Sequence, residues 1–277
     1  MEFLVLGSLE VRDEDRAVDV GPRMQRALLA VLLRDPGTAI SLDRLTDALW
    51  GDSPPGAPHS ALHVYVSNLR RVLEPGRPAR AQPTVLVRQP PGYCLRVEPG
   101  SIDAGRFVAL VAAGRGRLVA GDPAGAAAAL EAALGLWRGS PYADLSSEPF
   151  LQGEIARLGE LRAGALETLA DAQLELGAHA AIIADLEQMA AEEPLRERRW
   201  ELLALALYRS GRQTESLRVL RQARDSLVEE LGIEPGAALR RLEQDILQHA
   251  PTLDWHPAAD PALRAAAPSP AAAARPA

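Results

Sequence analysis

The sequence contains no lysine, so all 30 of its basic side chains are arginines. Without lysine there is no phosphate-binding G-x-x-x-x-G-K-[ST] loop, and neither a G-x-G-x-x-G nor a G-x-S-x-G motif occurs. These absences remove the common signatures of nucleotide-binding enzymes and of serine hydrolases. We therefore expect a protein that is not an enzyme.

Cysteine is almost as scarce. Cys94 stands alone, which excludes an internal disulfide and a cysteine-based metal cluster. The histidine pair with metal-like spacing, His59 and His63, has neither a third ligand nor the glutamate of an H-E-x-x-H arrangement. We expect neither a bound metal nor a cofactor.

Long apolar runs are also missing. No stretch approaches the roughly 18 consecutive apolar residues of a membrane span, and no basic flank followed by an apolar core opens the chain. A cytoplasmic protein without a membrane partner is expected. Aromatic residues make up only 4% of the 277 residues, whereas hydrophobic residues make up 47% and alanine and leucine are abundant, which favours helices. The length allows one large domain or two modest ones.

Charge is distributed unevenly along the chain. The net charge is −7, yet residues 59–97 carry six arginines against the single acid Glu74. Residues 100–277 carry 18 arginines and 25 acids. This separation favours a segment that faces nucleic acid, joined to an acidic body with another task.

The first 98 residues predict a small domain with the element order β-β-α-α-α-β-β. Strands are expected over 2–11 and 16–20, helices over 24–33, 42–50 and 58–73, and a β-hairpin over 84–97 around a Pro-Pro-Gly turn. This order is typical of a winged helix-turn-helix, in which the hairpin is the wing.

The helix expected over 58–73 has one face built for burial. Its opposite face carries short polar side chains and two adjacent arginines, which suits insertion into the major groove of DNA. An ordinary solvated surface is the alternative interpretation, but the basic hairpin beside the helix favours DNA. The predicted interface comprises Ser60, His63, Val64, Ser67, Asn68, Arg70, Arg71 and, on the wing, Arg88.

From Ile102 onward the pattern predicts successive helices. Gly177 and Gly211 lie 34 residues apart, the tetratricopeptide period. If each glycine marks a helix turn, apolar or small residues recur five and nine positions later. We therefore predict a winged-helix domain over 1–98, a tetratricopeptide-like domain over 99–250 and a disordered Ala/Pro-rich tail over 251–277.

Several separated motifs carry a resemblance to a known family. Segments 42–52, 61–73 and 88–95, with 194–200 and 227–236 further on, resemble the actinomycete antibiotic regulatory proteins (SARP). That family combines an OmpR-type winged helix with an all-helical bacterial transcriptional activation domain (BTAD). The resemblance implies a mainly α fold with a small β component and an activator of an antibiotic biosynthetic cluster.

The resemblance also implies partners. These are direct repeats in promoter DNA, a second copy of the chain at least when bound to DNA, and RNA polymerase holoenzyme, at the nucleoid. The polymerase would be contacted through the connector residues Asp52, Ser53, Pro54 and Pro55. Family members often differ at the positions of His63 and Asn68, so their base preference does not transfer.

Two other classes of function stay open from the sequence alone. The chain could be a tetratricopeptide interaction scaffold whose first domain binds protein rather than DNA. A weaker alternative is an enzyme with an unrecognised site.

Overall fold

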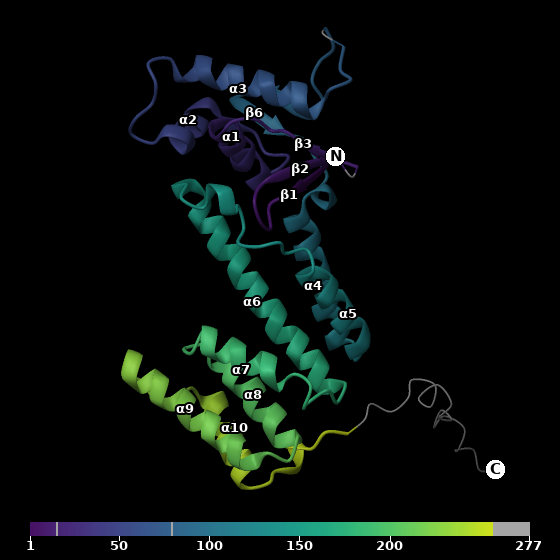
Figure 1. Cartoon of the computed structure of the whole chain (residues 1–277), viewed down its shortest axis with the longest axis vertical. Helices are drawn as coiled ribbons and strands as arrows, with labels where there is room; N and C mark the ends of the chain where they lie inside the picture. Colours follow the sequence, from purple (N-terminus) through teal and green to yellow (C-terminus); the bar gives the residue numbers. More distant parts are fainter. Residues whose placement is uncertain (15, 79, 257–277) are drawn as a thin grey trace, which may run out of the picture. The chain divides into compact units, whose positions relative to one another are not determined.

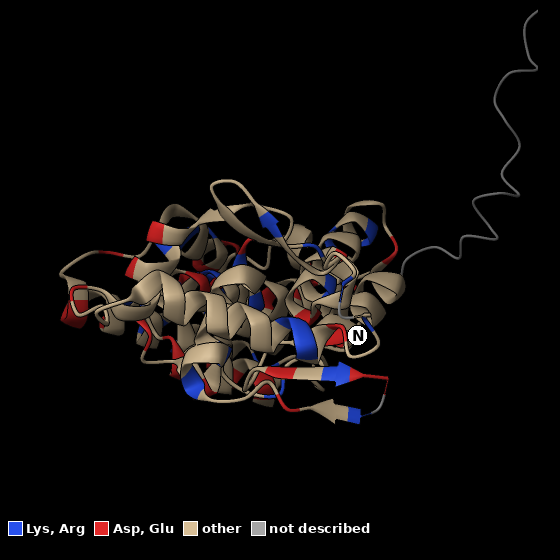
Figure 2. Cartoon of the chain, turned by 90° about the horizontal axis from the view of Figure 1, so that it is seen from above, with Lys and Arg blue, Asp and Glu red and all other residues tan. Residues whose placement is uncertain are grey.

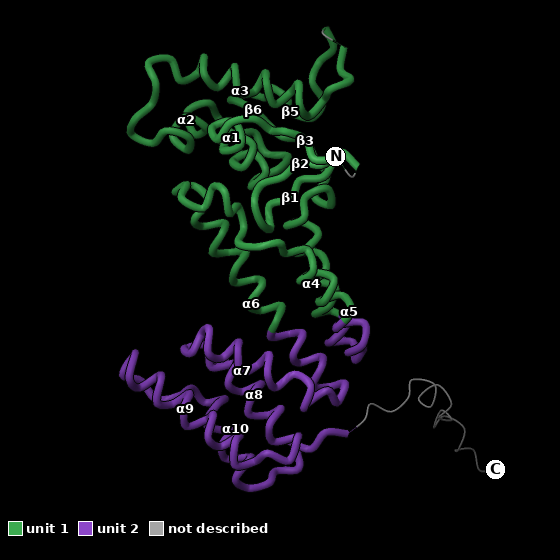
Figure 3. Tube along the Cα trace, in the orientation of Figure 1, with its two compact units in different colours: residues 1–116, 128–166 green, residues 117–127, 167–277 purple. Residues whose placement is uncertain are grey.

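The computed structural model describes residues 1–14, 16–78 and 80–256 (Figure 1). The chain divides into two compact units (Figure 3). The first comprises residues 1–116 and 128–166, and the second comprises residues 117–127 and the chain from 167 onward. The predicted boundary at residue 98 therefore lies inside the first unit.

The N-terminal sheet has three antiparallel strands in the order β1-β2-β3, formed by Glu2–Leu4, Glu10–Asp13 and Arg16–Val18. The prediction of one continuous strand over 2–11 was wrong. Val5, Leu6 and Leu9 are buried as an apolar strand would be. Their backbone groups, however, bond to Asp103 and to residues 138–144 of the same unit, so the chain leaves the sheet after Leu4.

Three helices follow as predicted: α1 (Arg23–Arg34), α2 (Leu42–Trp50) and α3 (Pro58–Leu73). The Ser41 hydroxyl accepts a hydrogen bond from the backbone N–H of Arg44 at 3.2 Å, and Ser41 thereby caps the start of α2. Each of the three helices packs on the other two. Leu62, Val66, Leu69 and Leu73 are buried on α3 and fix which face of this helix remains open.

The wing is a second antiparallel sheet, with the order β4-β6-β5. The predicted hairpin is confirmed as β5 (Leu86–Gln89) and β6 (Gly92–Leu95). The third strand, β4 (Ile40–Ser41), was not predicted from the sequence, and it pairs with the start of β6. A Cβ atom at Gly92 would overlap the backbone carbonyl of Ile40, so this pairing requires glycine.

The rest of the described chain is helical. A 3-10 turn at Pro99–Ser101 leads into α4 (Asp103–Val119) and α5 (Pro123–Leu134), and two short turns (Ala143–Leu145 and Pro149–Leu151) precede the long α6 (Gln152–Glu175). Then come α7 (Ile183–Glu192), α8 (Glu197–Arg209), α9 (Gln213–Leu231) and α10 (Ala237–Leu247). In the second unit, α8 packs against α7, α9 and α10.

Burial in the helical segment follows the positions counted from its turn glycines. Gly177 and Gly211 both have positive φ angles, +81° and +76°, and each lies in a turn between helices. A third turn glycine, Gly121, has a φ angle of +78°. Every residue five or nine positions after these three glycines is buried, namely Ala126, Ile182, Ser216, Leu130, Leu186 and Leu220. The pattern therefore located the core positions of the helical segment from sequence alone.

The predicted tail overlaps only partly with the described residues. Residues 257–277 lie outside them. Pro251–Leu253 forms a 3-10 turn, and the Trp255 indole N–H donates to the Glu175 carbonyl at 2.9 Å. The expectation of disorder is therefore not met for 251–256, because Leu253 and Trp255 give this segment apolar surface to bury.

Candidate nucleic-acid interface

The open face of α3 consists of two distinct edges. Pro58 is the first residue of the helix, where its missing N–H leaves no carbonyl unsatisfied. Ser60, Val64, Ser67 and Arg71 follow at the i, i+4, i+7 and i+11 spacing of one helical stripe, and all four are exposed. We call these four residues the outer stripe. His63 and Arg70 lie on a neighbouring edge that faces the wing.

The wing-facing edge of α3 is held by Tyr93 on β6. The guanidinium carbon of Arg70 lies 5.5 Å from the centroid of the Tyr93 ring, and Arg70 Nε donates to the Leu86 carbonyl at 2.8 Å. The ring of His63 meets the same tyrosine edge-on, with the two centroids 6.3 Å apart. Burial lowers the pKa of Arg70 from its usual value, and this shift reflects its packing between helix and wing.

Sequence reasoning missed Tyr93 as the contact between helix and wing. Arg70 and Arg71 look equivalent in sequence, but the structure separates their roles. Arg70 contacts the wing, whereas Arg71 is exposed and its Nη2 lies 3.5 Å from Asn68 Oδ1 on the same helix. The spacing of His63 and Arg70, seven residues apart on one helix edge, was the available signal for a shared neighbour.

The single acid of the basic segment is turned inward. Glu74 accepts hydrogen bonds from the backbone N–H and the hydroxyl of Thr84, both at 2.7 Å, and from the Val85 N–H at 3.2 Å. Burial alone would raise the pKa of Glu74, but these hydrogen bonds outweigh it and the pKa is lowered. The helix α3 itself contains no Asp or Glu, and in the ribbon of Figure 2, which is coloured by residue type, no acidic position interrupts it.

The wing adds basic side chains beside α3. Arg88 on β5 is exposed and lies opposite Tyr93 in the strand ladder. Arg96 is exposed too, and its Nη2 donates to the Gln89 amide oxygen at 3.3 Å. The exposed cations of α3 and of the wing thus belong to neighbouring elements, because α3 packs on β5. Such an arrangement can contact phosphates on both sides of a groove.

The predicted connector to RNA polymerase is exposed. Asp52, Ser53, Pro54 and Pro55 form the loop between α2 and α3, and the Ser53 N–H donates to the Trp50 carbonyl at 3.0 Å. The loop adjoins the N-terminal end of α3, so its side chains are accessible next to the outer stripe.

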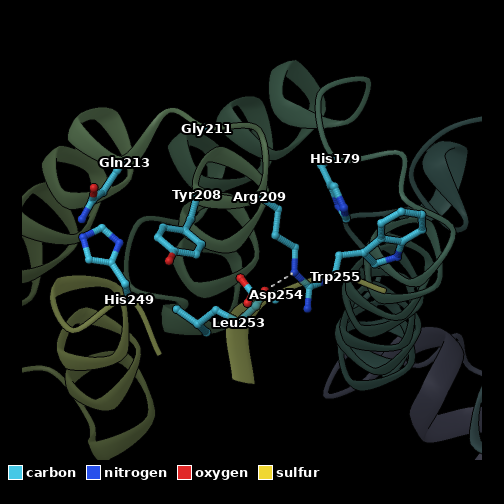
Figure 4. A pocket seen from close by; sticks show the side chains of 9 residues that line it. All are labelled: His179, Tyr208, Arg209, Gly211, Gln213, His249, Leu253, Asp254 and Trp255. Carbon is cyan, nitrogen blue, oxygen red and sulfur yellow. Dashed lines mark hydrogen bonds between the residues drawn. The ribbon is translucent and has the colours of Figure 1, made fainter. Parts of the chain in front are cut away.

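The second unit contains a separate hollow of about 430 Å³ (Figure 4). Gln213 and His249 stand at one end, Tyr208 and Arg209 in the middle, and His179 and Trp255 at the other end. Arg209 Nε donates to the Leu253 carbonyl at 2.9 Å. The residues that line this hollow include no serine, cysteine or lysine nucleophile.

Two further properties of the described residues bear on the function. No group of three or more His, Cys, Asp or Glu side chains among them is arranged to hold a metal ion. Within the same residues, each helix is too short or too polar to cross a lipid bilayer.

Two protein-family models match successive segments of this chain. The family model described as "Transcriptional regulatory protein, C terminal" matches residues 15–95. The model described as "Bacterial transcriptional activator domain" matches residues 102–247.

Individual relatives match over most of this chain. The regulatory protein AfsR of Streptomyces coelicolor is 41% identical over 91% of this chain, which spans only 25% of AfsR. The transcriptional regulator RedD of the same organism is 39% identical over 91% of the chain and 72% of RedD. The regulatory protein DnrI of Streptomyces peucetius is 33% identical over 92% of the chain and 94% of DnrI.

A solved structure shows the same fold. Mycobacterium tuberculosis EmbR, in complex with a low-affinity phosphopeptide, is 37% identical and superimposes with a TM-score of 0.86 over 90% of this chain and 65% of EmbR. The winged helix followed by a helical activator domain is therefore confirmed. The chain belongs to the antibiotic regulatory protein (SARP) family of transcriptional regulators.

Proposed function

We propose that the chain is a sequence-specific DNA-binding transcriptional activator of an antibiotic or other secondary-metabolite biosynthetic cluster. The observation that carries the proposal is the outer stripe of α3, which is exposed, free of acids and flanked by Arg88 of the wing. A helix of this kind fits the major groove, which is about 12 Å wide. Membership of the SARP family supports the same assignment.

The side chains of α3 and the wing have different tasks in this proposal. Ser60, Val64 and Ser67 face the base edges, and His63 and Asn68 flank them. Arg71 contacts guanine or phosphate, since a guanidinium can pair with both in bidentate geometry. Arg88 holds the backbone or the minor groove beside the wing. Arg70 keeps the wing in place against α3 and contributes its charge to the same surface.

The proposal extends to the partners of the bound protein. Two copies bind direct repeats in a promoter, and the exposed connector Asp52–Pro55 contacts RNA polymerase holoenzyme beside them. Such a complex is associated with the nucleoid. The connector supports this geometry because it joins the two helices of the helix-turn-helix and remains accessible.

The test is equilibrium binding of the full chain to duplexes that it selects from a random DNA pool. Affinity should fall with salt, and the slope of log affinity against log salt should decrease by about 0.9 for each phosphate contact removed. Arg71→Ala and Arg88→Ala should weaken binding. The matched control Arg241→Ala, an exposed arginine on α10, should not.

Two outcomes would overturn the proposal. One is that no sequence is enriched and no salt-sensitive binding is found. The other is that Arg71→Ala and Arg88→Ala bind as tightly as wild type. The first result would favour a protein-interaction scaffold without direct DNA binding, and the second would show that α3 and the wing do not form the DNA interface.

A further inference from the structure

Val64 is an exposed apolar residue on a polar surface. Its side chain is 56% exposed, and among the described residues of 1–98 only Met1 and Val64 are large hydrophobic residues with exposed side chains. The other aliphatic residues of α3 are buried or partly buried in the domain. The fold therefore gives no packing reason for an apolar side chain at this position.

The exposed neighbours of Val64 on the helix surface are polar. Ser60 lies one turn before it and Ser67 one turn after it, and Arg71 follows at the next turn. Val64 is thus an isolated apolar group rather than part of a patch that would bind another protein. A valine also favours the helix less than alanine does, because its β-branch restricts χ1.

The major groove offers one matching apolar group. Among the four bases, only thymine carries a methyl group there, at C5. The short side chains of Ser60 and Ser67 allow the helix backbone to approach the base edges closely on both sides of Val64. The isopropyl group of Val64 can pack against the thymine methyl group and remove it from water. A polar side chain at this position would leave the thymine methyl group exposed to water.

We propose that Val64 is a specificity-determining residue that packs against the C5-methyl group of a thymine in each half of the recognised DNA repeat. This inference rests on the proposed DNA-binding function and adds the identity of one base. Val64 selects thymine over cytosine because cytosine has no C5-methyl group and presents an N4 amino donor at the neighbouring position.

The experiment removes the thymine methyl group and the valine side chain separately. Each thymine of a selected duplex is replaced in turn by deoxyuridine, which lacks only the C5-methyl group, and binding is measured for wild type and Val64→Ala. At one thymine in each repeat, deoxyuridine should weaken wild-type binding about three- to five-fold, the factor for losing one buried methyl group. Val64→Ala should bind the thymine duplex more weakly by a similar factor and lose nothing more with deoxyuridine.

Val119→Ala is the matched control, since Val119 is 91% exposed on α4 and should leave the deoxyuridine profile unchanged. Val64→Ala should unfold at the temperature of wild type or slightly above it, because alanine favours the helix more than valine does. The inference is overturned if no thymine is sensitive, or if wild type and Val64→Ala are equally sensitive at every thymine. These results differ from failure of the proposed function, in which no sequence is enriched and Arg71→Ala has no effect.

Discussion

Arg70 and Tyr93 join α3 to the wing: the guanidinium carbon of Arg70 lies 5.5 Å from the centroid of the Tyr93 ring. The hydrogen bond from Arg70 Nε to the Leu86 carbonyl adds a second link between the same elements. Arg71, the next residue, is exposed and has no such contact with the wing among the described residues. Two neighbouring arginines therefore have different physical roles.

This difference predicts that replacing Arg70 and replacing Arg71 lower the stability of the protein by different amounts, although both replacements weaken DNA binding. Arg70→Ala should lower the free energy of unfolding by about 1 kcal/mol, since it removes a cation–π contact and a hydrogen bond. Arg71→Ala should change it by less than about 0.5 kcal/mol, as is usual for an exposed site. Both variants should bind DNA more weakly. Urea denaturation and DNA titration of the two variants would check this, and equal stability losses would contradict it.

The sequence was sufficient to predict the elements that depend on residues close together in the chain. The 34-residue spacing of Gly177 and Gly211 located buried positions such as Ser216, because helical burial repeats along the chain. The Pro-Pro-Gly turn located the wing. The direction of the Arg70 side chain could not be found this way, because it depends on Tyr93, 23 positions later in the chain.

Contacts between distant segments explain the remaining failures. Residues 138–144, with the sequence Arg-Gly-Ser-Pro-Tyr-Ala-Asp, have the composition of a loop. In the structure, the backbone N–H groups of Arg138 and Tyr142 donate to the carbonyls of Leu6 and Val5 at 2.7 and 2.9 Å. No periodic pattern marks such pairing, because both segments are irregular and their bonds follow from tertiary packing. The same reason explains why the strand expected over 2–11 ends at Leu4.

Asp103 should be essential for the stability of the first unit. Its carboxylate accepts hydrogen bonds from the backbone N–H groups of Val5 at 2.7 Å and Leu6 at 3.0 Å, and it is almost fully buried. Asp103→Ala would leave these two buried donors without an acceptor, at about 1–3 kcal/mol each. The free energy of unfolding should therefore fall by at least about 2 kcal/mol.

Chemical denaturation followed by circular dichroism would measure this loss. Asp225→Ala, at an exposed position on α9, serves as the control and should unfold like wild type. Asp103→Asn retains one acceptor oxygen and should recover part of the stability. An Asp103→Ala variant as stable as the control would show that water replaces the carboxylate.

Gly92 should tolerate no larger residue. A methyl group there would overlap the Ile40 carbonyl, so Gly92→Ala must push β4 and β6 apart. We expect a loss of about 2 kcal/mol or more in unfolding free energy, together with weaker DNA binding because the wing shifts relative to α3. Gly76→Ala is the control, since its Cβ would meet open space. Similar behaviour of the two variants would contradict the β4–β6 pairing.

His179 predicts a pH dependence of stability in the second unit. Burial, with a further contribution from the charge of Arg209, lowers the pKa of His179 below its usual 6.5. In the unfolded chain the imidazole takes up a proton as the pH falls below about 6.5, whereas the folded chain keeps it neutral. The unfolded state then binds more protons, so the free energy of unfolding decreases with falling pH, down to the lowered pKa of the folded state.

The measurement is urea denaturation between about pH 5 and 8, where His179 alone can contribute a slope of at most about 1.4 kcal/mol per pH unit. His179→Phe keeps an aromatic ring against Trp255, whose ring centroid lies 5.5 Å from that of His179, and removes the titrating nitrogens. This variant should lose the part of the slope below pH 6.5. His256→Phe, at an exposed position, should keep it. A slope unchanged by His179→Phe would mean that the buried imidazole accepts its proton as readily in the folded chain as in the unfolded one.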